Sequence, residues 1–408
     1  MASRLLLGLD IGSSKTRAVI AEAIPPTNGA RDPIRILGLG TVPTEGMRRC
    51  VLTNLEAATE AILAATRAAE QMAGLEVETA YVGVAGVHAD VSRSSGVVAV
   101  AGREIDPRDV RRVDEVGRAV AIPPDRFLLH AIPQEYVVDG RGGIQDPVGM
   151  TATRLESEVC IVTAAADACR DLRKAVEKAG YRAEELVLEP LASSLAVVEE
   201  SERREGVALI EVGGGSTDVV VFRADKIRRV RTFPWGSETV TSDIAKGLGV
   251  PVEEARRLKE RFGSALRSRM DPKEKVEVAG PGTGPPRRIS RELLAHIIEQ
   301  RLDEIFGLVY EELEEAALLD RLGAGVVLTG GGASLPGTLE LVRNVFNLPV
   351  RLGEPGTSLA GLSEAVRRPG LSGGVGLALY GSARAPKGGL GGAGRLLGRV
   401  GDWLRDFF

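Results

Sequence analysis

The sequence has few cysteine, histidine and aromatic residues. Its 408 residues include three cysteines, three histidines, eight phenylalanines, five tyrosines and two tryptophans. The cysteines (Cys50, Cys160 and Cys169) have no close metal-ligand spacing with one another or with the histidines. An odd and sparse cysteine count argues against a disulfide framework and favours a reducing compartment. Because aromatic residues are scarce, we expect a core packed mainly from aliphatic side chains.

The sequence also lacks a net basic charge and a long apolar run. Its formal net charge is −4, so no overall positive field is available to hold nucleic acid. No stretch of 18 uncharged apolar residues occurs, which excludes a transmembrane helix. Residues 1–4 lead directly into an apolar, strand-like run over 5–11, with no signal-peptide pattern. We therefore expect a protein of the cytoplasm.

Glycine, in contrast, is abundant, with 50 residues, and several glycines follow apolar strands. Three such strands end in turns of Gly, Ser and Thr, at 9–15, 212–217 and 328–334. A duplicated α/β unit would produce this repetition, with each half offering one loop to a shared ligand. Between the strands, helical periodicity predicts helices over the following ranges: 54–73 (capped by Thr53 or Asn54), 106–121, 165–179, 190–202, 243–263, 290–319 and 371–382.

The three loops have the chemistry of a phosphate-binding site. Glycines let backbone N–H groups converge on an anion, and Ser and Thr hydroxyls add donors. Lys15 adds a positive charge suited to phosphate. Asp10 and Asp218 stand at the loop edges, where carboxylates would hold a hydrated Mg²⁺. Neither a Walker A loop nor a strand-linked G-x-G-x-x-G occurs, which disfavours P-loop and Rossmann folds.

Five segments, in order along the chain, resemble the motifs of the actin-like ATPase superfamily. Residues 10–16 (DIGSSKT), 211–218 (EVGGGSTD) and 328–334 (LTGGGAS) resemble its first phosphate, second phosphate and adenosine motifs. Residues 189–194 and 373–378 resemble its two connecting helices. The resemblance covers nearly the whole chain. It implies an α/β fold of two duplicated domains around a nucleotide cleft, with ATP and Mg²⁺ as cofactors.

Within this superfamily the chain looks most like the FtsA family of bacterial division proteins. It has the size of FtsA, an insertion where FtsA carries its distinctive subdomain, and a linker followed by an amphipathic tail. The resemblance implies these boundaries: domain I at 1–85, 159–204 and 366–382, with the inserted subdomain 1C at 86–158; domain II at 205–242 and 323–365, with subdomain 2B at 243–322; a linker at 383–394; and a C-terminal helix at 395–408.

The tail itself predicts a membrane-targeting helix. Its apolar residues occupy an arc of roughly 140° on a helical wheel. Its charged residues fall outside that arc, and a glycine-rich linker precedes it. Such a helix lies in a membrane interface, although docking on its own domain or on a partner is the alternative. The expected membrane contacts are Leu396, Leu397, Val400, Trp403, Leu404, Phe407 and Phe408.

The resemblance also implies roles for individual residues. Glu189 corresponds to an acid that orients the attacking water, with a surface or capping carboxylate as the alternative. Asp10 and Asp218, and Glu211 through water, would hold Mg²⁺. The superfamily usually has Asp at the Glu211 position, and Arg256 stands where relatives often carry a ribose-contacting Glu, so we expect ATP binding with at most slow hydrolysis. The expected nucleotide contacts are Asp10, Gly12, Ser13, Ser14, Lys15, Gly213, Gly214, Gly215, Ser216, Thr217, Lys259, Gly330, Gly331 and Gly332.

Finally, the resemblance implies partners and a place in the cell. An FtsA-like protein would polymerise, anchor the ring of the tubulin-like FtsZ to the cytoplasmic face of the membrane at the division site, and recruit later division proteins. Four arginines, Arg287, Arg288, Arg291 and Arg301, are candidate contacts for the FtsZ C-terminal peptide, or form a solvated basic face. The alternative functions are a PilM-like pilus assembly protein, which typically lacks such a tail, and a small-molecule kinase, for which no catalytic aspartate is evident.

Overall fold

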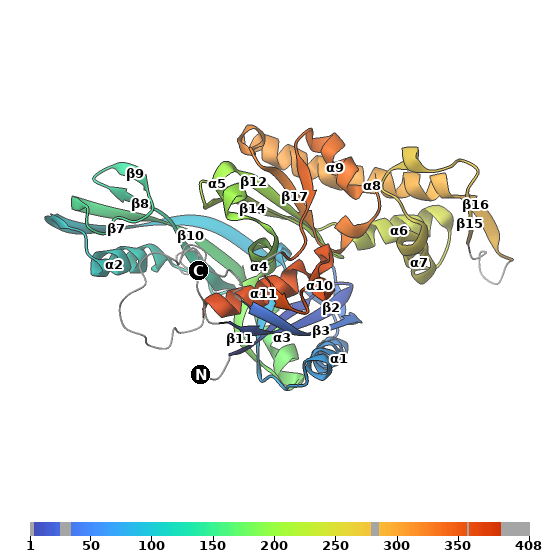
Figure 1. Cartoon of the computed structure of the whole chain (residues 1–408), viewed down its shortest axis with the longest axis horizontal. Helices are drawn as coiled ribbons and strands as arrows, with labels where there is room; N and C mark the ends of the chain where they lie inside the picture. The colour runs from blue at the N-terminus through green and yellow to red at the C-terminus, as the bar shows by residue number, and fades with distance from the viewer. Residues whose placement is uncertain (1–3, 25–33, 279–284, 357–358, 385–408) are drawn as a thin grey trace.

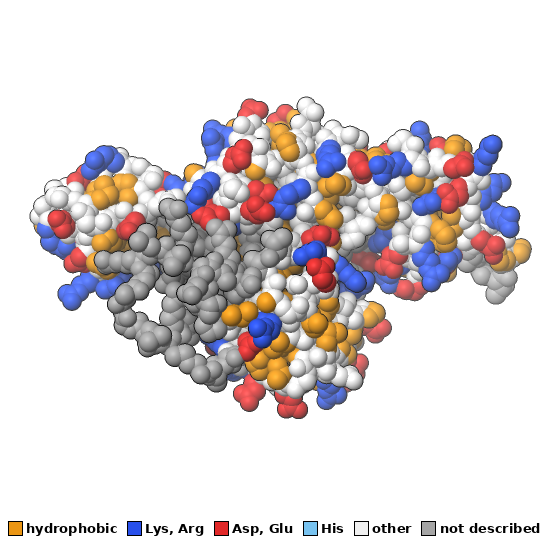
Figure 2. Space-filling view, in the orientation of Figure 1, with side chains coloured by type: hydrophobic (Ala, Val, Ile, Leu, Met, Phe, Trp, Pro, Cys, Tyr) orange, Lys and Arg blue, Asp and Glu red, His pale blue; other side chains and the backbone are white. Residues whose placement is uncertain are grey.

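The computed structural model describes residues 4–24, 34–278, 285–356 and 359–384. The molecule is elongated, with two α/β layers stacked at its centre (Figure 1). A smaller sheet extends from one end, and a group of helices with a two-stranded sheet forms the other end. On the face shown in Figure 2, basic and acidic side chains are interspersed, without a large area of one charge.

The first central sheet is built around a hairpin of β1 and β2. These strands and β3 are antiparallel neighbours, and β6 and β11 continue the sheet in parallel beyond β1. In spatial order the strands are β11 (Arg182–Leu188), β6 (Thr79–Val84), β1 (Leu5–Ile11), β2 (Lys15–Ala23), β3 (Ile34–Pro43) and the short β19 (Ala360–Gly361).

The second central sheet repeats this arrangement. A hairpin of β12 and β13 is extended by antiparallel β14 on one side and by parallel β17 and β18 on the other. The order is β18 (Val350–Leu352), β17 (Gly325–Thr329), β12 (Val207–Val212), β13 (Thr217–Arg223) and β14 (Lys226–Phe233). The predicted duplicated α/β unit is therefore confirmed, because five strands of each sheet have the same spatial order and the same sequence of parallel and antiparallel pairings.

Two helices between the sheets cross at close range. These are α4 (Glu189–Val197) and α11 (Ser372–Ala383), which occupy the positions of the two connecting helices inferred from the sequence. A Cβ on Gly376 would lie 1.9 Å from the carbonyl oxygen of Ala192, so only glycine permits this approach. Both helices reach the cleft at their N-terminal ends, where the candidate site lies.

The outer surface of the first sheet is covered by α1 (Leu55–Ala73) and α3 (Ala166–Lys178). The side chain of Asn54 caps α1 by accepting hydrogen bonds from the backbone N–H groups of Glu56 and Ala57, as the sequence pattern indicated. Smaller elements complete this half: β4 (Met47–Arg48), β5 (Val51–Leu52), α10 (Ser363–Val366) and the 3₁₀ turn η5 (Pro369–Leu371), whereas α5 (Glu200–Glu205) packs on β13 of the second sheet.

The insertion begins at the 3₁₀ turn η1 (Gly86–His88) and forms its own sheet and small core. Val98, Val113 and Leu155 pack in that core, under the helix α2 (Pro107–Arg118). The strands in spatial order are β7 (Ala89–Glu104), β10 (Thr151–Ala165), β8 (Arg126–Val138) and β9 (Arg141–Ile144). β10 continues past residue 158 and leads directly into α3.

The opposite end of the molecule is mainly helical. The long helix α8 buries one apolar face against α6 and the second sheet. The elements at this end of the molecule are α6 (Ser237–Leu248), α7 (Val252–Phe262), η2 (Arg267–Arg269), β15 (Lys275–Val278), β16 (Arg287–Ser290), α8 (Arg291–Glu315) and η3 (Leu319–Arg321). Beyond β17 they are followed by η4 (Gly331–Ser334) and α9 (Thr338–Phe346).

Two predicted helices were wrong in their continuity. The helix expected over 190–202 is broken after α4, because Val198 is extended and Glu199 caps a new helix. The helix expected over 243–263 is two helices, because Gly249 ends α6 with a left-handed φ of 60° and Pro251 is the N-cap residue of α7. In the insertion, β8 is one strand over Arg126–Val138 that passes through Pro133.

None of the helices in the described ranges is both long enough and apolar enough to cross a bilayer. The predicted linker at 383–394 was wrong at its start, because Ala383 is the last residue of α11. The rest of that linker, from residue 385, and the predicted membrane helix at 395–408 lie outside the described residues.

Candidate functional site

The two central hairpins meet turn to turn at the cleft. In the first, the Gly12 N–H donates to the Lys15 carbonyl oxygen at 3.2 Å; in the second, the Gly213 N–H donates to the Ser216 carbonyl oxygen at 2.9 Å. A Cβ on Gly215 would lie 2.4 Å from Ser13 Oγ, and one on Gly214 would lie 2.8 Å from Ser14 Oγ. The glycines of one loop therefore accommodate the serines of the other, and the structure brings both predicted phosphate loops together.

Cys50 lies between these loops, a position that the sequence did not indicate. Its backbone N–H donates to Ser13 Oγ at 2.7 Å, and its Sγ lies 3.6 Å from Ser216 Oγ. Its carbonyl oxygen accepts from His88 Nε2 at 2.7 Å, which links the loops to the start of the insertion. Burial raises the pKa of the Cys50 thiol, so the side chain is a neutral, close-packed spacer.

Four carboxylates converge behind the loops, from four different elements. Asp10 is near the end of β1, Glu189 begins α4, Glu211 is on β12 and Asp218 is on β13. Gly373 at the start of α11 marks the shared space, because a Cβ there would lie 3.2 Å from Glu189 Oε1 and 3.5 Å from Asp10 Oδ2. The sequence predicted all four, although they are spread over more than two hundred positions.

Burial disfavours charge on three of these acids, Glu189, Glu211 and Asp218, and raises the pKa of each. Burial, with Asp10 and Glu211 adding repulsion, raises the pKa of Glu189 well above its usual value. Burial and the Asp218 charge raise the pKa of Glu211 to about 8. Burial raises the pKa of Asp218 to about 6, although hydrogen bonds from Thr232 (2.6 Å) and Ser216 (2.8 Å) oppose that shift. A cluster of this kind gains stability when a cation enters it.

The available cations do not satisfy the cluster. Arg17 forms an ion pair with Asp10, at 2.9 Å from Nη1 to Oδ2, but Asp10 Oδ1 is buried without a hydrogen-bond partner among the described residues. Within those residues, no three His, Cys, Asp or Glu side chains are placed to bind one metal directly. The unpartnered Asp10 oxygen and the all-oxygen set of donors fit Mg²⁺, which prefers oxygen ligands and keeps several of its waters.

The predicted adenosine loop is shaped partly by packing on β12. A Cβ on Gly330 would lie 2.5 Å from the Val212 carbonyl oxygen, and one on Gly332 would lie 2.4 Å from Val212 Cγ1. Gly331 has open space, apart from the Arg17 guanidinium, which a Cβ there would approach to 3.7 Å. Arg17 thus faces both the acid cluster and this loop, and the sequence analysis did not select it.

Lys15 and Lys259 occupy different surroundings. Lys15 is exposed at the tip of the first turn, where its ammonium is free to meet a phosphate. Lys259 is buried and donates to the Ser237 carbonyl oxygen at 2.8 Å and to Thr241 Oγ1 at 2.7 Å, and burial lowers its pKa. Arg256, one turn away, pairs with Glu238 at 3.0 Å. Lys259 therefore secures α7 to α6 beside the second loop.

A buried histidine supports the start of α4. His130, on β8 of the insertion, accepts a hydrogen bond from the Leu188 N–H at 3.0 Å, one residue before Glu189. Burial lowers the pKa of His130 to about 3, so the ring stays neutral and available as an acceptor at physiological pH. No local pattern in the sequence pointed to this contact, because it joins residues 58 positions apart.

Three of the four arginines considered for the FtsZ peptide are engaged within the fold. Arg301 pairs with Asp243 and Glu304, and Arg291 pairs with Glu274 at 2.9 Å. Arg287 donates to the Leu248 carbonyl oxygen. Arg288 is exposed on β16 and has no side-chain partner within the described ranges.

The sequence is similar to known proteins over nearly its whole length. Residues 208–376 match the family model of the cell division protein FtsA, and residues 86–163 match that of the SHS2 domain inserted in FtsA. The chain is 40% identical to the cell division protein FtsA of Pseudomonas aeruginosa over 93% of this chain and 90% of the relative. It is 34% identical to the Escherichia coli K12 protein of the same name, over 98% and 96%.

Solved structures show the same architecture at lower identity. A chain of the PilM–PilN type IV pilus biogenesis complex has a TM-score of 0.64 at 18% identity, with 92% of this chain and 98% of that chain covered. MreB5 of Spiroplasma citri bound to ADP has a TM-score of 0.52 at 15% identity, with 86% and 92% covered. These likenesses show the actin-like fold, and the pilus likeness is one of structure alone.

Proposed function

The chain belongs to the FtsA family of cell division proteins, and from that premise we propose that it binds ATP with Mg²⁺, polymerises, and attaches the FtsZ ring to the cytoplasmic face of the membrane at the division site. The observation that carries the nucleotide part is the meeting of two glycine–serine turns over a buried cluster of four carboxylates. Such turns bind phosphates through backbone N–H groups, and a cation beside those phosphates would stabilise the charged form of the acids.

Each residue in the cleft has a distinct task in this proposal. Ser13, Ser14, Lys15 and the 213–217 turn bind the phosphates, while residues 330–332 and Lys259 lie toward the nucleoside. Asp10, Asp218 and Glu211 hold the water shell of Mg²⁺, which supplies positive charge against the phosphates. Glu189 orients the attacking water. Its raised pKa falls when a cation enters, because the cation stabilises the charged form.

Nucleotide titration tests this arrangement. Binding of a fluorescent ATP analogue to the full chain should depend on Mg²⁺, and Asp218→Asn should weaken it by about tenfold or more. Glu189→Gln should leave binding within about twofold while it lowers the slow hydrolysis by about a hundredfold. Glu60→Gln, an exposed acid on α1, is the matched control. Mg²⁺-independent binding that ignores Asp218 would contradict the proposed cleft.

The membrane part rests on the amphipathic sequence of residues 395–408. We expect the full chain to co-sediment with vesicles of anionic phospholipid, and deletion of 395–408 to abolish this while ATP binding persists. Because one short amphipathic segment binds reversibly, ATP-dependent polymers that present many copies should bind much more firmly. Trp403→Glu should reproduce the deletion, whereas Arg399→Gln should have a small effect. Undiminished vesicle binding by the truncated chain would refute the membrane role.

The partner part rests on the helical end of the second sheet. A surface cavity of about 440 Å³ lies there, lined by residues that include Arg257, Phe262 and Lys275. Its lining residue Val278 pairs with Arg287 across β15 and β16, so the exposed Arg288 lies close by. We propose that the FtsZ C-terminal peptide binds this region. Arg288→Glu should weaken peptide binding in a titration, and Arg170→Glu on α3 should not.

A further inference from the structure

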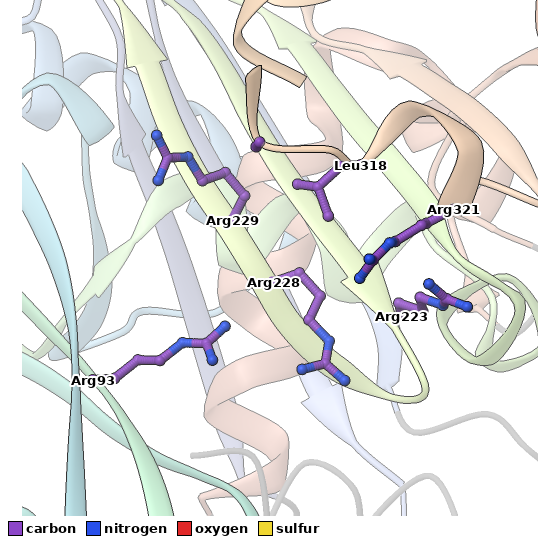
Figure 3. Close-up of a pocket in the computed structure, with 7 residues that line it drawn as sticks. Arg93, Arg223, Arg228, Arg229, Leu318 and Arg321 are labelled. Carbon is purple, nitrogen blue, oxygen red and sulfur yellow. The ribbon is translucent and has the colours of Figure 1, made fainter. Parts of the chain in front are cut away.

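A second cavity, away from the four carboxylates, is lined by arginines. It has a volume of about 510 Å³ and lies where the insertion meets the second central sheet. Figure 3 shows Arg93 reaching from β7 toward Arg228 on β14, with Arg321 and Arg223 on the other side of that strand. The lining consists of Arg93, Arg223, Arg228, Arg229, Ala316, Leu318 and Arg321, and contains no acidic residue.

A β-bulge brings two consecutive arginines to this cavity. Val221 of β13 faces Arg229 of β14, but the next residue, Phe222, faces Ile227, so Arg228 is the extra residue of the pair of strands. In a regular strand, neighbouring side chains point to opposite faces. The bulge removes that alternation locally, and Arg228 and Arg229 both line the cavity.

Most of the positive charge here is not neutralised within the fold. Arg93 pairs with Glu158 at 2.8 Å, and Arg229 pairs with Glu312. In contrast, the guanidinium groups of Arg223, Arg228 and Arg321 make no ion pair or side-chain hydrogen bond with any residue the structure describes. Four of these five arginines are exposed, so solvent screens much of their repulsion, and a multivalent anion that contacts several of them at once removes what remains.

We propose that this cavity is a binding site for a compact, soluble oligophosphate, such as the phosphate chain of a nucleotide or inorganic triphosphate. Arginine presents a planar fork of donors that matches phosphate oxygens, and one oligophosphate carries enough charge for three guanidinium groups. The volume falls in the range of small-ligand sites, about 300–1,000 Å³. A carboxylate supplies only one charge per side chain, so an acidic peptide would need several side chains to contact the same guanidinium groups.

The position of the cavity gives the ligand a structural consequence. Arg93 belongs to the insertion, and the other arginines belong to the second sheet and the turn after α8. Near the cavity, the Ile227 N–H donates to Gln134 Oε1 at 2.7 Å, and Lys226 pairs with Glu135, so β14 already joins β8 here. At its other end, β14 places Thr232 against Asp218 in the cleft. An anion bound by both sides would hold the insertion to the second sheet.

Calorimetric titration of inorganic triphosphate into the full chain, without Mg²⁺ and at low salt, tests the proposal. Arg228→Gln with Arg321→Gln should weaken binding by about tenfold or more, because two charge-assisted contacts are lost. The matched control removes two exposed arginines elsewhere, Arg111→Gln with Arg170→Gln, and should stay within about twofold. Arg228→Lys with Arg321→Lys keeps the charge but loses the fork, so it should give an intermediate affinity.

Separate measurements distinguish this site from the cleft and from other ligands. Thermal unfolding confirms that each variant folds, and the Mg²⁺-dependent ATP analogue should bind the Arg228/Arg321 variant as it binds the wild type. Equal triphosphate affinity in all variants would overturn the proposal. It would also be overturned if the double variant lost binding to a polyglutamate peptide or to phosphatidylglycerol vesicles while its triphosphate affinity was unchanged, since an acidic protein or a membrane would then be the ligand.

Discussion

Two hairpins of the same design meet at the cleft, and they differ in the pair of residues that flanks each turn. In the first hairpin, Asp10 on β1 faces Arg17 on β2, and the two form a buried ion pair. In the second, Glu211 on β12 faces Asp218 on β13 at the corresponding positions, and both are acids. Opposite charges across a strand pair stabilise it, whereas like charges destabilise it.

Because of this difference, the stability of the two hairpins depends to different extents on a bound cation. The first hairpin is neutralised internally, so its loop is stable before any ligand arrives. The second retains two acids, Glu211 and Asp218, whose pKa values burial raises to about 8 and about 6, and the Asp218 charge adds repulsion at Glu211. It is therefore the half whose stability depends most on a bound cation, and four substitutions test that conclusion.

The largest expected effect comes from breaking the ion pair of the first hairpin. Arg17→Gln leaves the Asp10 carboxylate buried without its cation, and should lower the free energy of unfolding by about 3 kcal/mol at pH 7.5. Urea denaturation measures this. Arg35→Gln, in the same sheet, removes a pair with Glu22 that is long (3.8 Å) and largely exposed, and should cost well under about 1 kcal/mol. Equal midpoints for the two variants would mean that Asp10 needs no partner.

The next effect concerns the contact between the loops. A Cβ at position 215 would meet Ser13 Oγ at 2.4 Å and the Arg49 Cα at 2.9 Å, so backbone must move. Gly215→Ala should lower stability by about 1–3 kcal/mol and weaken ATP binding, as overpacking does. Gly307→Ala on α8 meets nothing within 4 Å and should be neutral or stabilising by up to about 1 kcal/mol. Unchanged nucleotide affinity in Gly215→Ala would show that the loops separate without cost.

A smaller, pH-dependent effect belongs to the second hairpin. The folded pKa of Glu211, about 8, exceeds its ordinary value of 4.5, so the native state retains a proton that the unfolded chain releases. Its contribution to stability is present below the ordinary value and is lost as pH rises through 8. Between pH 7 and 9 the ligand-free protein should lose about 1 kcal/mol from this group.

Glu211→Gln should remove that loss, because the amide carries no charge at any pH, whereas Glu60→Gln should retain it. Thermal or urea unfolding at several pH values gives the comparison. If the wild type and Glu211→Gln follow parallel pH profiles, Glu211 is not the group that resists ionisation.

The smallest effect concerns the serine that holds Cys50. Ser13→Ala removes the acceptor of the Cys50 N–H and should cost about 0.5–1 kcal/mol. Ser14→Ala removes a hydroxyl that touches Gly214 without a hydrogen bond to a described residue, and should cost less. A larger loss for Ser14→Ala, measured by urea denaturation, would mean that packing against glycine matters more than the Cys50 contact.

Much of the site could be predicted because its residues lie at recurring places in a local pattern. Asp10, Glu211 and Asp218 flank glycine turns after apolar strands, and Glu189 precedes a proline at a helix start. Arg17, Cys50, His88 and His130 could not be found in this way. Cys50, His88 and His130 act through contacts with residues 37 to 58 positions away, and Arg17 acts through the strand pairing of its own hairpin; no periodicity or spacing marks such contacts.

The same distinction applies to the fold. The sequence by itself determined the strands, the glycine turns and most helices, since these depend on period-2 and period-3.6 patterns and on residues with restricted backbone angles. Only the tertiary structure decided that Asp10 pairs with a cation while Glu211 has none among the described residues, that Cys50 separates the two loops, and that a bulge at Arg228 gathers arginines into one cavity. Those outcomes depend on long-range packing, which sets distance and burial, and through them charge.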